Sequence, residues 1–306
     1  MKYNKSFLDT YKKFISKGWY DSVIPTRTLE LWCENFSMSP SDKFDSSVCA
    51  FFLLNSLVFY QERQLEAIIV QIQDKIKSEL NQKYEELRGY RLSDDEIEGI
   101  WKIYKQESFI VTAAIPSQTG DSAYQATRFW RNISGIDIGS IADLSKVINE
   151  SGKKHIFFVD DFIGTGTKMT KFLSSRIPET KETVGDIINR FKDSVDFNIA
   201  VFAIYENGKK FILDQFPRVN FYFGDLYTEE YNLISEKCVL YDMFLEEKEN
   251  IIQYIKDKLK EFNDDNKYAL NLPVAFHHGC PNNSLSLYYK SSQNWNKLLS
   301  ESHPKN

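Results

Sequence analysis

The sequence predicts an α/β fold in which a parallel sheet is flanked by helices and preceded by a mostly helical region. From residue 108 to 224, apolar strand-like runs alternate with helix-like stretches in the order βαβαβαβ. This rhythm is typical of a parallel sheet with helices on both faces. Residues 1–105 instead carry apolar side chains at helical spacing. We therefore expect a helical N-terminal region over residues 1–105 and an α/β domain over residues 106–306.

Composition and charge argue against several classes of protein. The sequence has 38 Lys and Arg residues and 43 Asp and Glu residues, which gives a formal net charge of −5. Nucleic-acid binding would therefore need a local basic patch. The four cysteines form no C-x-x-C pair, and no zinc-ligand spacing occurs, which is typical of a protein from a reducing compartment. The longest apolar run, Val48–Phe59, is too short to span a membrane and predicts a buried helix. We expect a cytoplasmic protein with no membrane partner.

The helices expected in the first 105 residues follow from apolar periodicity and one capping motif. Periodic apolar side chains predict four helices, near residues 8–15 and 29–36 and over Ser47–Leu57 and Gln64–Gln82. Ser93, followed three residues later by Glu96, forms a capping box for a helix through about Lys105. No motif in this region carries chemistry. We therefore expect it to serve as a lid, a hood or a partner surface.

The elements expected in the α/β domain are assigned from apolar runs and amphipathic stretches. The predicted strands are Ser108–Ile115, Ile156–Val159, Phe197–Tyr205 and Val219–Phe223. The predicted helices are Ala123–Arg131, Ile138–Glu150, a stretch from Lys168 onward, Val184–Phe191, Lys209–Phe216 and Glu247–Phe262. Ligands of such sheets bind at the carboxyl ends of the strands. Asp160 and Asp161 fall at one of these ends.

The stretch His155–Thr170, HIFFVDDFIGTGTKMT, carries the clearest functional signal. An apolar strand ends in Asp160 and Asp161, and a glycine-bearing turn, Gly164–Thr167, leads into a helix. Glycines let the backbone N–H groups face inward, and the helix start favours an anion. Paired carboxylates can accept hydrogen bonds from vicinal ribose hydroxyls. These residues predict a sugar-phosphate site; the alternative is a buried strand with a solvated Asp pair and an ordinary turn.

This stretch resembles the phosphoribosyl pyrophosphate (PRPP) signature of the phosphoribosyltransferase (PRTase) fold: an apolar strand, two acids, two spacers and Thr-Gly. The resemblance implies that Asp160 and Asp161 face the ribose 2′- and 3′-hydroxyls during catalysis, and that the Thr165–Lys168 backbone holds the 5′-phosphate. It implies five ligand-binding residues here: Gly164, Thr165, Gly166, Thr167 and Lys168. There are two departures from the family pattern. Gly164 stands where a small hydroxyl or acid is usual, and Lys168 stands where a last hydroxyl is common.

The family resemblance also implies an earlier loop that contacts the pyrophosphate. The candidates here are Ser117, Thr119, Gly120, Asp121 and Ser122, although a plain turn uses the same residue types. Family members carry a mobile β-hairpin that shields the transition state from water. We find no sign of paired strands between Gly120 and His155, so we expect this hood to be truncated. No carboxylate cluster suggests a metal cage of the protein's own, so we expect Mg²⁺ to arrive with the ligand's pyrophosphate.

A second candidate segment is Pro273–Leu287, PVAFHHGCPNNSLSL. His277 and His278 are candidate catalytic groups for proton transfer, and Asn282 and Asn283 are candidate ligand-binding residues. Adjacent side chains in an extended segment point to opposite sides, so at most one histidine faces a given pocket. The alternative is an ordinary turn.

The layout as a whole resembles one subgroup of PRTase-like proteins. Its marks are a helical N-terminal region, an Asp-Asp-Phe-x-Gly motif, here residues 160–164, and a Pro-Asn-Asn segment, here residues 281–283. The subgroup is associated with bacterial conflict and anti-phage systems, some beside retron reverse transcriptases. The resemblance implies an enzyme-like defence effector that binds PRPP or a related ribose-phosphate nucleotide, with a defence-system protein or nucleoprotein as partner. The alternative is a catalytically inactive PRPP or nucleotide sensor that controls a partner protein or nucleic acid.

Overall fold

The computed structural model describes residues 24–36, 44–114, 122–177, 180–262 and 269–300. The chain forms two compact units: unit 1 comprises residues 1–61 and 228–306, and unit 2 comprises residues 62–227. Each unit has its own hydrophobic core. The boundary predicted near residue 105 falls inside unit 2. The predicted helix near residues 8–15 lies outside the described residues.

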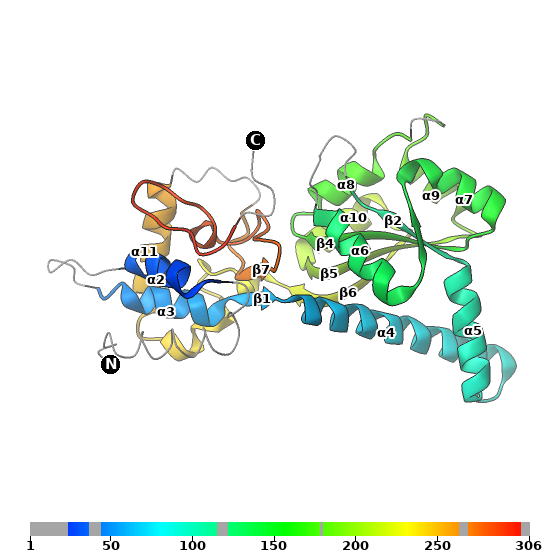
Figure 1. The fold of residues 1–306 in the computed structure, drawn as a ribbon, viewed down its shortest axis with the longest axis horizontal. Coiled ribbons are helices and arrows are strands. Elements are labelled where there is room, and N and C mark those ends of the chain that lie inside the picture. Colours follow the sequence, from blue (N-terminus) through cyan, green and yellow to red (C-terminus); the bar gives the residue numbers. More distant parts are fainter. Residues whose placement is uncertain (1–23, 37–43, 115–121, 178–179, 263–268, 301–306) are drawn as a thin grey trace. The chain divides into compact units, whose positions relative to one another are not determined.

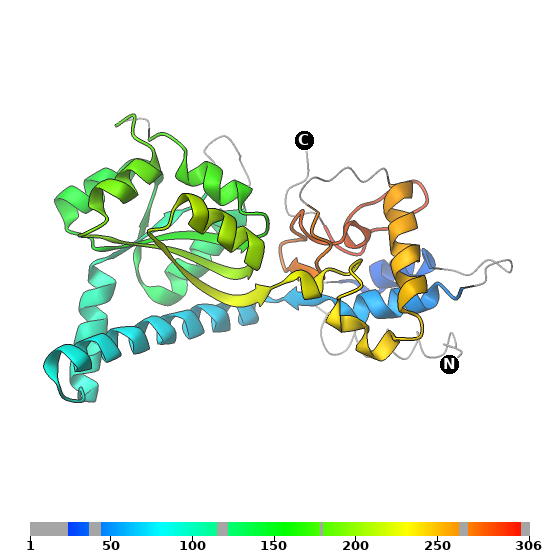
Figure 2. The ribbon, with the colours of Figure 1, turned by 180° about the vertical axis from the view of Figure 1, so that it is seen from behind.

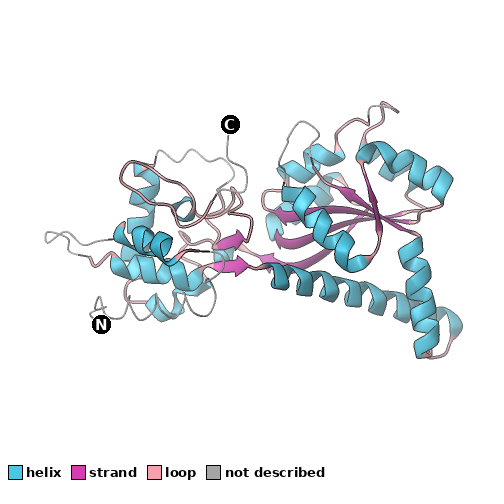
Figure 3. Cartoon of the chain, viewed as in Figure 1, coloured by secondary structure: helices cyan, strands magenta, loops and turns pink. Residues whose placement is uncertain are grey.

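Unit 2 is built on a five-stranded sheet in which every neighbouring pair of strands is parallel (Figures 1 and 3). In chain order the strands are β2 (Ser108–Thr112), β3 (Asp137–Gly139), β4 (His155–Ile163), β5 (Asp196–Tyr205) and β6 (Val219–Tyr227). Their order across the sheet is β3-β2-β4-β5-β6. The predicted fold class, a parallel sheet flanked by helices, is therefore confirmed.

The strand order reverses its direction once, between β2 and β4. From β2 the chain moves outward to β3 at one edge, and it then returns to place β4 on the other side of β2. The later strands, β5 and β6, continue in that second direction. In open α/β sheets, ligands bind outside the carboxyl ends of the strands at such a reversal. The topology thus marks the carboxyl ends of β2 and β4.

Helices cover both faces of this sheet. Those of unit 2 are α4 (Glu62–Arg88), α5 (Asp94–Gln106), α6 (Ser122–Ser134), α7 (Leu144–Ser151), α8 (Thr167–Leu173), α9 (Val184–Phe191) and α10 (Glu206–Gln215). Successive side chains of a strand point to opposite faces. Accordingly, Phe157 of β4 stacks with Trp130 of α6, whereas its neighbour Phe158 packs edge-on against Phe172 of α8. The long helix α4 runs along the sheet beside β6 (Figure 2).

Local sequence signals explain several element ends in unit 2. Ser93 and Glu96 form the predicted capping box of α5, with both reciprocal hydrogen bonds present. Gly152 ends α7 in the left-handed conformation, with φ of 63°, which glycine adopts without strain. The helix predicted over Ile138–Glu150 is wrong at its start. Residues 137–139 form the edge strand β3, which pairs with β2, and three residues are too few to show an alternating pattern.

Unit 1 brings together the two ends of the sequence. Its helices are α2 (Thr26–Glu34), α3 (Ser47–Ser56) and α11 (Lys248–Glu261), with short 3₁₀ turns η3 (Glu229–Tyr231), η4 (Val239–Phe244) and η5 (Ser286–Tyr288). A small parallel sheet pairs β1 (Val58–Tyr60) with β7 (Val274–Phe276). The apolar run that begins at Val48 is therefore a buried helix, as predicted, only as far as Ser56. Its last residues belong to β1.

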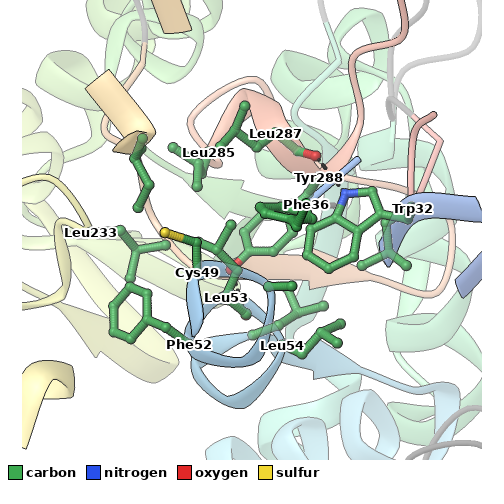
Figure 4. Packing of buried hydrophobic residues seen from close by; sticks show 14 of the residues in the cluster. Trp32, Phe36, Cys49, Phe52, Leu53, Leu54, Leu233, Leu285, Leu287 and Tyr288 are labelled. Carbon is green, nitrogen blue, oxygen red and sulfur yellow. Dashed lines mark hydrogen bonds between the residues drawn. The ribbon is translucent and has the colours of Figure 1, made fainter. Parts of the chain in front are cut away.

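The core of unit 1 is rich in aromatic side chains that make specific polar contacts (Figure 4). The indole Nε1 of Trp32 donates to the carbonyl oxygen of Leu287 at 2.9 Å. The hydroxyl of Tyr288 donates to the carbonyl oxygen of Leu53 at 2.8 Å. Each bond joins residues more than 200 positions apart in the sequence. The C-terminal helix and loop therefore pack with the N-terminal helices, and both belong to unit 1.

No helix among the residues that the structure describes is long and apolar enough to cross a membrane.

Candidate functional site

The paired acids lie at the point of the sheet that the topology marks. Asp160 and Asp161 are part of β4, which continues past them to Ile163, whereas the sequence predicts that they end the strand. The neighbouring strand β2 makes its last pairing with Val159, just before the acids. On the other side, Asp160 is still paired with Val201 of β5. The acids therefore begin where β2 ends, at the reversal of strand order.

Both acids are buried and hydrogen-bonded. Asp160 is 1% exposed and Asp161 is 4% exposed. One carboxylate oxygen of Asp160, Oδ1, accepts the backbone N–H of Asp161 at 3.0 Å, and Oδ1 of Asp161 accepts the backbone N–H of Phe162 at 2.9 Å. A buried carboxylate is stable as an anion only when hydrogen bonds or an opposite charge compensate for lost water.

For Asp160, the opposite charge comes from Lys168. The ammonium Nζ of Lys168 lies 2.9 Å from the same Oδ1 of Asp160, and the lysine side chain is 28% exposed. Lys168 is the second residue of α8, so the pair joins the strand to the helix that follows it. The sequence predicts a role for the backbone of Lys168 in the turn. It does not predict this side-chain contact, because no local pattern links residues on opposite sides of a turn.

The turn between β4 and α8 is tight and internally bonded. Gly166 adopts a left-handed conformation, with φ of 79°, at the N-cap of α8. The hydroxyl oxygens of Thr165 and Thr167 lie 3.0 Å apart, within hydrogen-bond distance. The carbonyl oxygen of Gly166 accepts the backbone N–H of Thr170 at 2.9 Å, at the start of α8. The predicted sequence of strand, acids, Gly/Thr turn and helix is thus present as one continuous segment.

This turn packs directly against the backbone of α10. A Cβ atom placed on Gly208 would lie 1.9 Å from the carbonyl oxygen of Gly164. A Cβ atom placed on Gly166 would lie 2.7 Å from the carbonyl oxygen of Gly208. Real Cβ contacts are essentially never this short, so both positions require glycine. Gly208 was not among the predicted site residues, although a glycine directly before the predicted helix Lys209–Phe216 was a signal.

These residues combine acceptors and donors in a short segment. The carboxylates of Asp160 and Asp161 are acceptors, which suits sugar hydroxyls. The hydroxyls of Thr165 and Thr167 and the ammonium of Lys168 are donors, which suits a phosphate. Chemically, the arrangement can hold a molecule that carries hydroxyls at one end and an anionic group at the other.

The residues of the predicted pyrophosphate loop lie mostly outside the described part of the chain. This applies to Ser117, Thr119, Gly120 and Asp121. Ser122 is described: it is the first residue of α6 and is buried. The role of this loop stays a prediction.

The two histidines of the C-terminal segment belong to unit 1, whereas the acids belong to unit 2. His277 follows β7, and its backbone N–H donates to the carbonyl oxygen of Tyr60 at 2.9 Å. The ring of His278 stacks on that of Phe276, with centroids 5.4 Å apart, and lies edge-on to His277 at 4.9 Å. Both histidines are therefore held by local packing in unit 1. Their catalytic role stays a prediction.

The two asparagines of this segment differ in exposure. Asn282 is exposed, while Asn283 is buried. The backbone carbonyl of Asn283 accepts the N–H groups of Leu270 and Leu272, so its main chain has a structural role.

Among the described residues, no group of three or more His, Cys, Asp or Glu side chains could hold a metal ion. Mg²⁺ requires oxygen ligands in near-octahedral geometry. At Asp160 the oxygen Oδ1 already holds the ammonium of Lys168. These residues do not fit a magnesium ion held by the protein at Asp160.

Comparison with known proteins identifies the family. A family model named PRTase-CE matches residues 29–300, which is most of the chain. The chain belongs to the PRTase-CE family. The match spans both units, and it confirms the PRTase-like resemblance on which the interpretation of Asp160–Lys168 depends. No curated protein matches this sequence.

Among solved structures, the AQ2163 protein from Aquifex aeolicus is similar to a part of this PRTase-CE protein. The two are 12% identical with a TM-score of 0.24, over 40% of this chain and 56% of that chain. A likeness this small bears on neither the fold nor the function.

Proposed function

We propose that this PRTase-CE protein binds PRPP, or a related ribose-phosphate nucleotide, at Asp160, Asp161 and the Thr165–Lys168 turn. The observation that carries the proposal is the continuous strand, acid pair, turn and helix at the reversal of strand order, in a chain of a PRTase-like family. The carboxylates accept hydrogen bonds from the ribose hydroxyls. The turn, with its two threonine hydroxyls, holds the 5′-phosphate. Residues 117–122 contact the pyrophosphate.

In this proposal, Mg²⁺ enters with the ligand. The pyrophosphate oxygens of PRPP supply ligands that the ion prefers, and the ion keeps most of its waters. An ion bound in this way would neutralise charge on the pyrophosphate as it leaves. The protein's own residues hold the sugar and its phosphate.

The first candidate activity is phosphoribosyl or glycosyl transfer by an enzyme-like effector of bacterial anti-phage defence. An acceptor lone pair forms a bond to C1′, and the C1′–O bond breaks with its electron pair leaving on the pyrophosphate. The acceptor loses its proton to a general base, for which His277 and His278 of unit 1 are the predicted candidates. The link to defence, including retron systems, comes from the Asp-Asp-Phe-x-Gly and Pro-Asn-Asn segments, and the partner would be a defence-system protein or nucleoprotein.

The second candidate is a sensor that binds the same ligand without turning it over and controls a partner protein or nucleic acid. Lys168 stands where the family pattern has a hydroxyl, and its ammonium contacts Asp160. This departure from the family pattern favours the sensor. The truncated hood predicted from the sequence also favours the sensor, because transfer needs a site closed to water.

Ligand binding is tested by isothermal titration of PRPP with Mg²⁺ into the wild type and the double variant D160N/D161N. Each charge-assisted hydrogen bond contributes roughly 1.5–3 kcal/mol, so losing one at each acid should weaken binding by roughly 10²- to 10⁴-fold. D214N, an exposed position on α10, is the matched control and should bind as the wild type does. Equal affinity in the double variant would show that the acids do not hold the ligand.

Pyrophosphate release separates the two candidate activities. An enzyme should release pyrophosphate from PRPP with a suitable acceptor, and the double variant H277A/H278A should slow the release without changing PRPP affinity. A sensor should bind PRPP and release none. In cells challenged with phage, protection retained by D160N/D161N would exclude a ligand-dependent role in defence.

A further inference from the structure

The contact between Lys168 and Asp160 places one positive charge inside the proposed site. The ammonium lies 2.9 Å from the carboxylate, whose side chain is almost fully buried. An ammonium and a carboxylate at this distance form a charge-assisted hydrogen bond, which is short and strong. The charge of Asp160 is therefore compensated within the protein by a side chain of the following helix.

Lys168 also belongs to the segment that would hold the phosphate. Its backbone follows Thr167, whose hydroxyl lies 3.0 Å from that of Thr165. The turn itself is fixed from outside by the close approach of Gly208. Lys168 thus contributes its backbone to the turn that we expect to hold the phosphate. Its charge lies beside Asp160, which we expect to bind the ribose.

This arrangement is unfavourable for a divalent cation at Asp160. A lysine ammonium has donors and no acceptor, so it cannot be a metal ligand. A cation that approached Oδ1 of Asp160 would have to displace the ammonium or lie beside it, and like charges at such short distances repel. The ammonium already supplies the positive charge that a metal would bring.

We propose that Lys168 is the resident cation of this site and takes the place of a divalent metal at Asp160. It neutralises Asp160 in the free protein and stays beside it when a ribose phosphate binds. Ribose 5-phosphate, which has no pyrophosphate to carry a metal, therefore binds without Mg²⁺. This inference rests on the proposed ribose-phosphate function, and it makes Lys168 a positioning and specificity residue of that site.

The test measures the affinity for ribose 5-phosphate by isothermal titration, once with EDTA and once with Mg²⁺. The wild type should bind equally in both, within two-fold. K168Q removes the charge and should bind at least ten-fold more weakly in EDTA, with part of the loss restored by Mg²⁺. K168R keeps a cation and should show no response to Mg²⁺. K171Q, an exposed lysine on the same helix, should behave as the wild type does.

The double variant D160N/K168Q removes both charges and identifies where Mg²⁺ acts. It should show no response to Mg²⁺, because the carboxylate that would attract the ion is absent. If D160N/K168Q responds as K168Q does, the ion binds elsewhere and the proposal is wrong. A wild type that needs Mg²⁺ to bind ribose 5-phosphate also overturns it.

Thermal unfolding tests the role of Lys168 even if the proposed function is wrong, because it needs no bound ribose phosphate. If no variant binds ribose 5-phosphate, the proposed function fails, but Mg²⁺ should still raise the Tm of K168Q and leave the wild type and D160N/K168Q unchanged. A K168Q chain that folds only in Mg²⁺ supports the proposal in the same way. Equal Tm changes in wild type and K168Q overturn it. So does a K168Q chain that stays unfolded in both buffers, since Lys168 then has a structural role only.

Discussion

Replacing Gly208 of α10 by Ala tests whether the turn of the proposed site is held by the helix beside it. The new methyl carbon would lie 1.9 Å from the carbonyl oxygen of Gly164, and 2.9 Å from its carbonyl carbon. Contacts below 3.0 Å are essentially never seen for real Cβ atoms. Both atoms belong to the backbone, so no side-chain rotation relieves the clash. Either the turn or the helix must move by about 1 Å.

Two opposing effects set the change in stability. Alanine favours a helix over glycine by about 1 kcal/mol in a helix interior, and Gly208 lies in the first turn of α10. Forcing an extra methyl group into close-packed structure costs about 1–3 kcal/mol. We therefore expect G208A to lower the free energy of unfolding by up to about 2 kcal/mol. A turn displaced by about 1 Å no longer holds its donors at hydrogen-bond distance, so we also expect roughly a ten-fold loss in affinity for ribose 5-phosphate, equal to about 1.4 kcal/mol or one hydrogen bond.

Gly99 provides the matched control. It lies in the interior of α5 and is exposed, and a Cβ atom placed on it would meet nothing within 4 Å. G99A should therefore raise the free energy of unfolding by about 0.5–1 kcal/mol and leave affinity unchanged. Urea unfolding and isothermal titration measure both quantities. If G208A were as stable as G99A and bound ligand as the wild type does, the turn would not depend on α10.

Two further predictions concern pH dependence and domain organisation. The hydrogen bond from His155 Nδ1 at 3.0 Å, opposed by partial burial, lowers the pKa of Asp196 below its ordinary value. Its contribution to stability should be present above about pH 4 and lost as pH falls through the lowered pKa. D196N should therefore be less stable than the wild type in urea unfolding at about pH 6, and this difference should shrink as the pH falls below about 4; a difference independent of pH would contradict this. Residues 62–227, expressed alone, should unfold cooperatively in calorimetry because they contain the whole sheet and its helices. Residues 106–306, the predicted α/β domain, should not, and cooperative folding of that chain would contradict the division observed.

The parts of the fold that could be predicted from the sequence are those with a local cause. The helix at Val184–Phe191 was predicted with the bounds that the structure has, because its apolar positions follow helical spacing. The capping box of Ser93 and Glu96 is likewise local. The strands β4 and β5 were recognised from their apolar runs, although β4 continues beyond its run, Ile156–Val159, to Ile163. Together these elements gave the correct fold class.

The parts that could not be predicted depend on contacts between distant residues. The division into two units follows from a core in which Trp32 contacts Leu287 and Tyr288 contacts Leu53. No periodicity reveals which distant segments share a core. The strand at Asp137–Gly139 was missed for another reason: it is defined by its pairing with β2 rather than by its own pattern.

The candidate site likewise has features that could be predicted from local sequence and features that depend on contacts between distant residues. The motif from Asp160 to Lys168 is contiguous in sequence, so its strand, turn and helix could be predicted from residue types alone. The Lys168–Asp160 contact and the approach of Gly208 to the turn both require the three-dimensional arrangement. His277 and His278, predicted as catalytic partners of the acids, belong to unit 1. Their role stays a prediction until binding and turnover are measured.

The most direct test of the proposed function is isothermal titration of PRPP with Mg²⁺ into the wild-type protein and D160N/D161N, with D214N alongside. Binding by the wild type and D214N, and a loss of roughly 10²- to 10⁴-fold in D160N/D161N, is the predicted result. If the wild type does not bind PRPP, or if D160N/D161N binds it equally well, the strand, acid pair and turn of β4 and α8 are not a ribose-phosphate site.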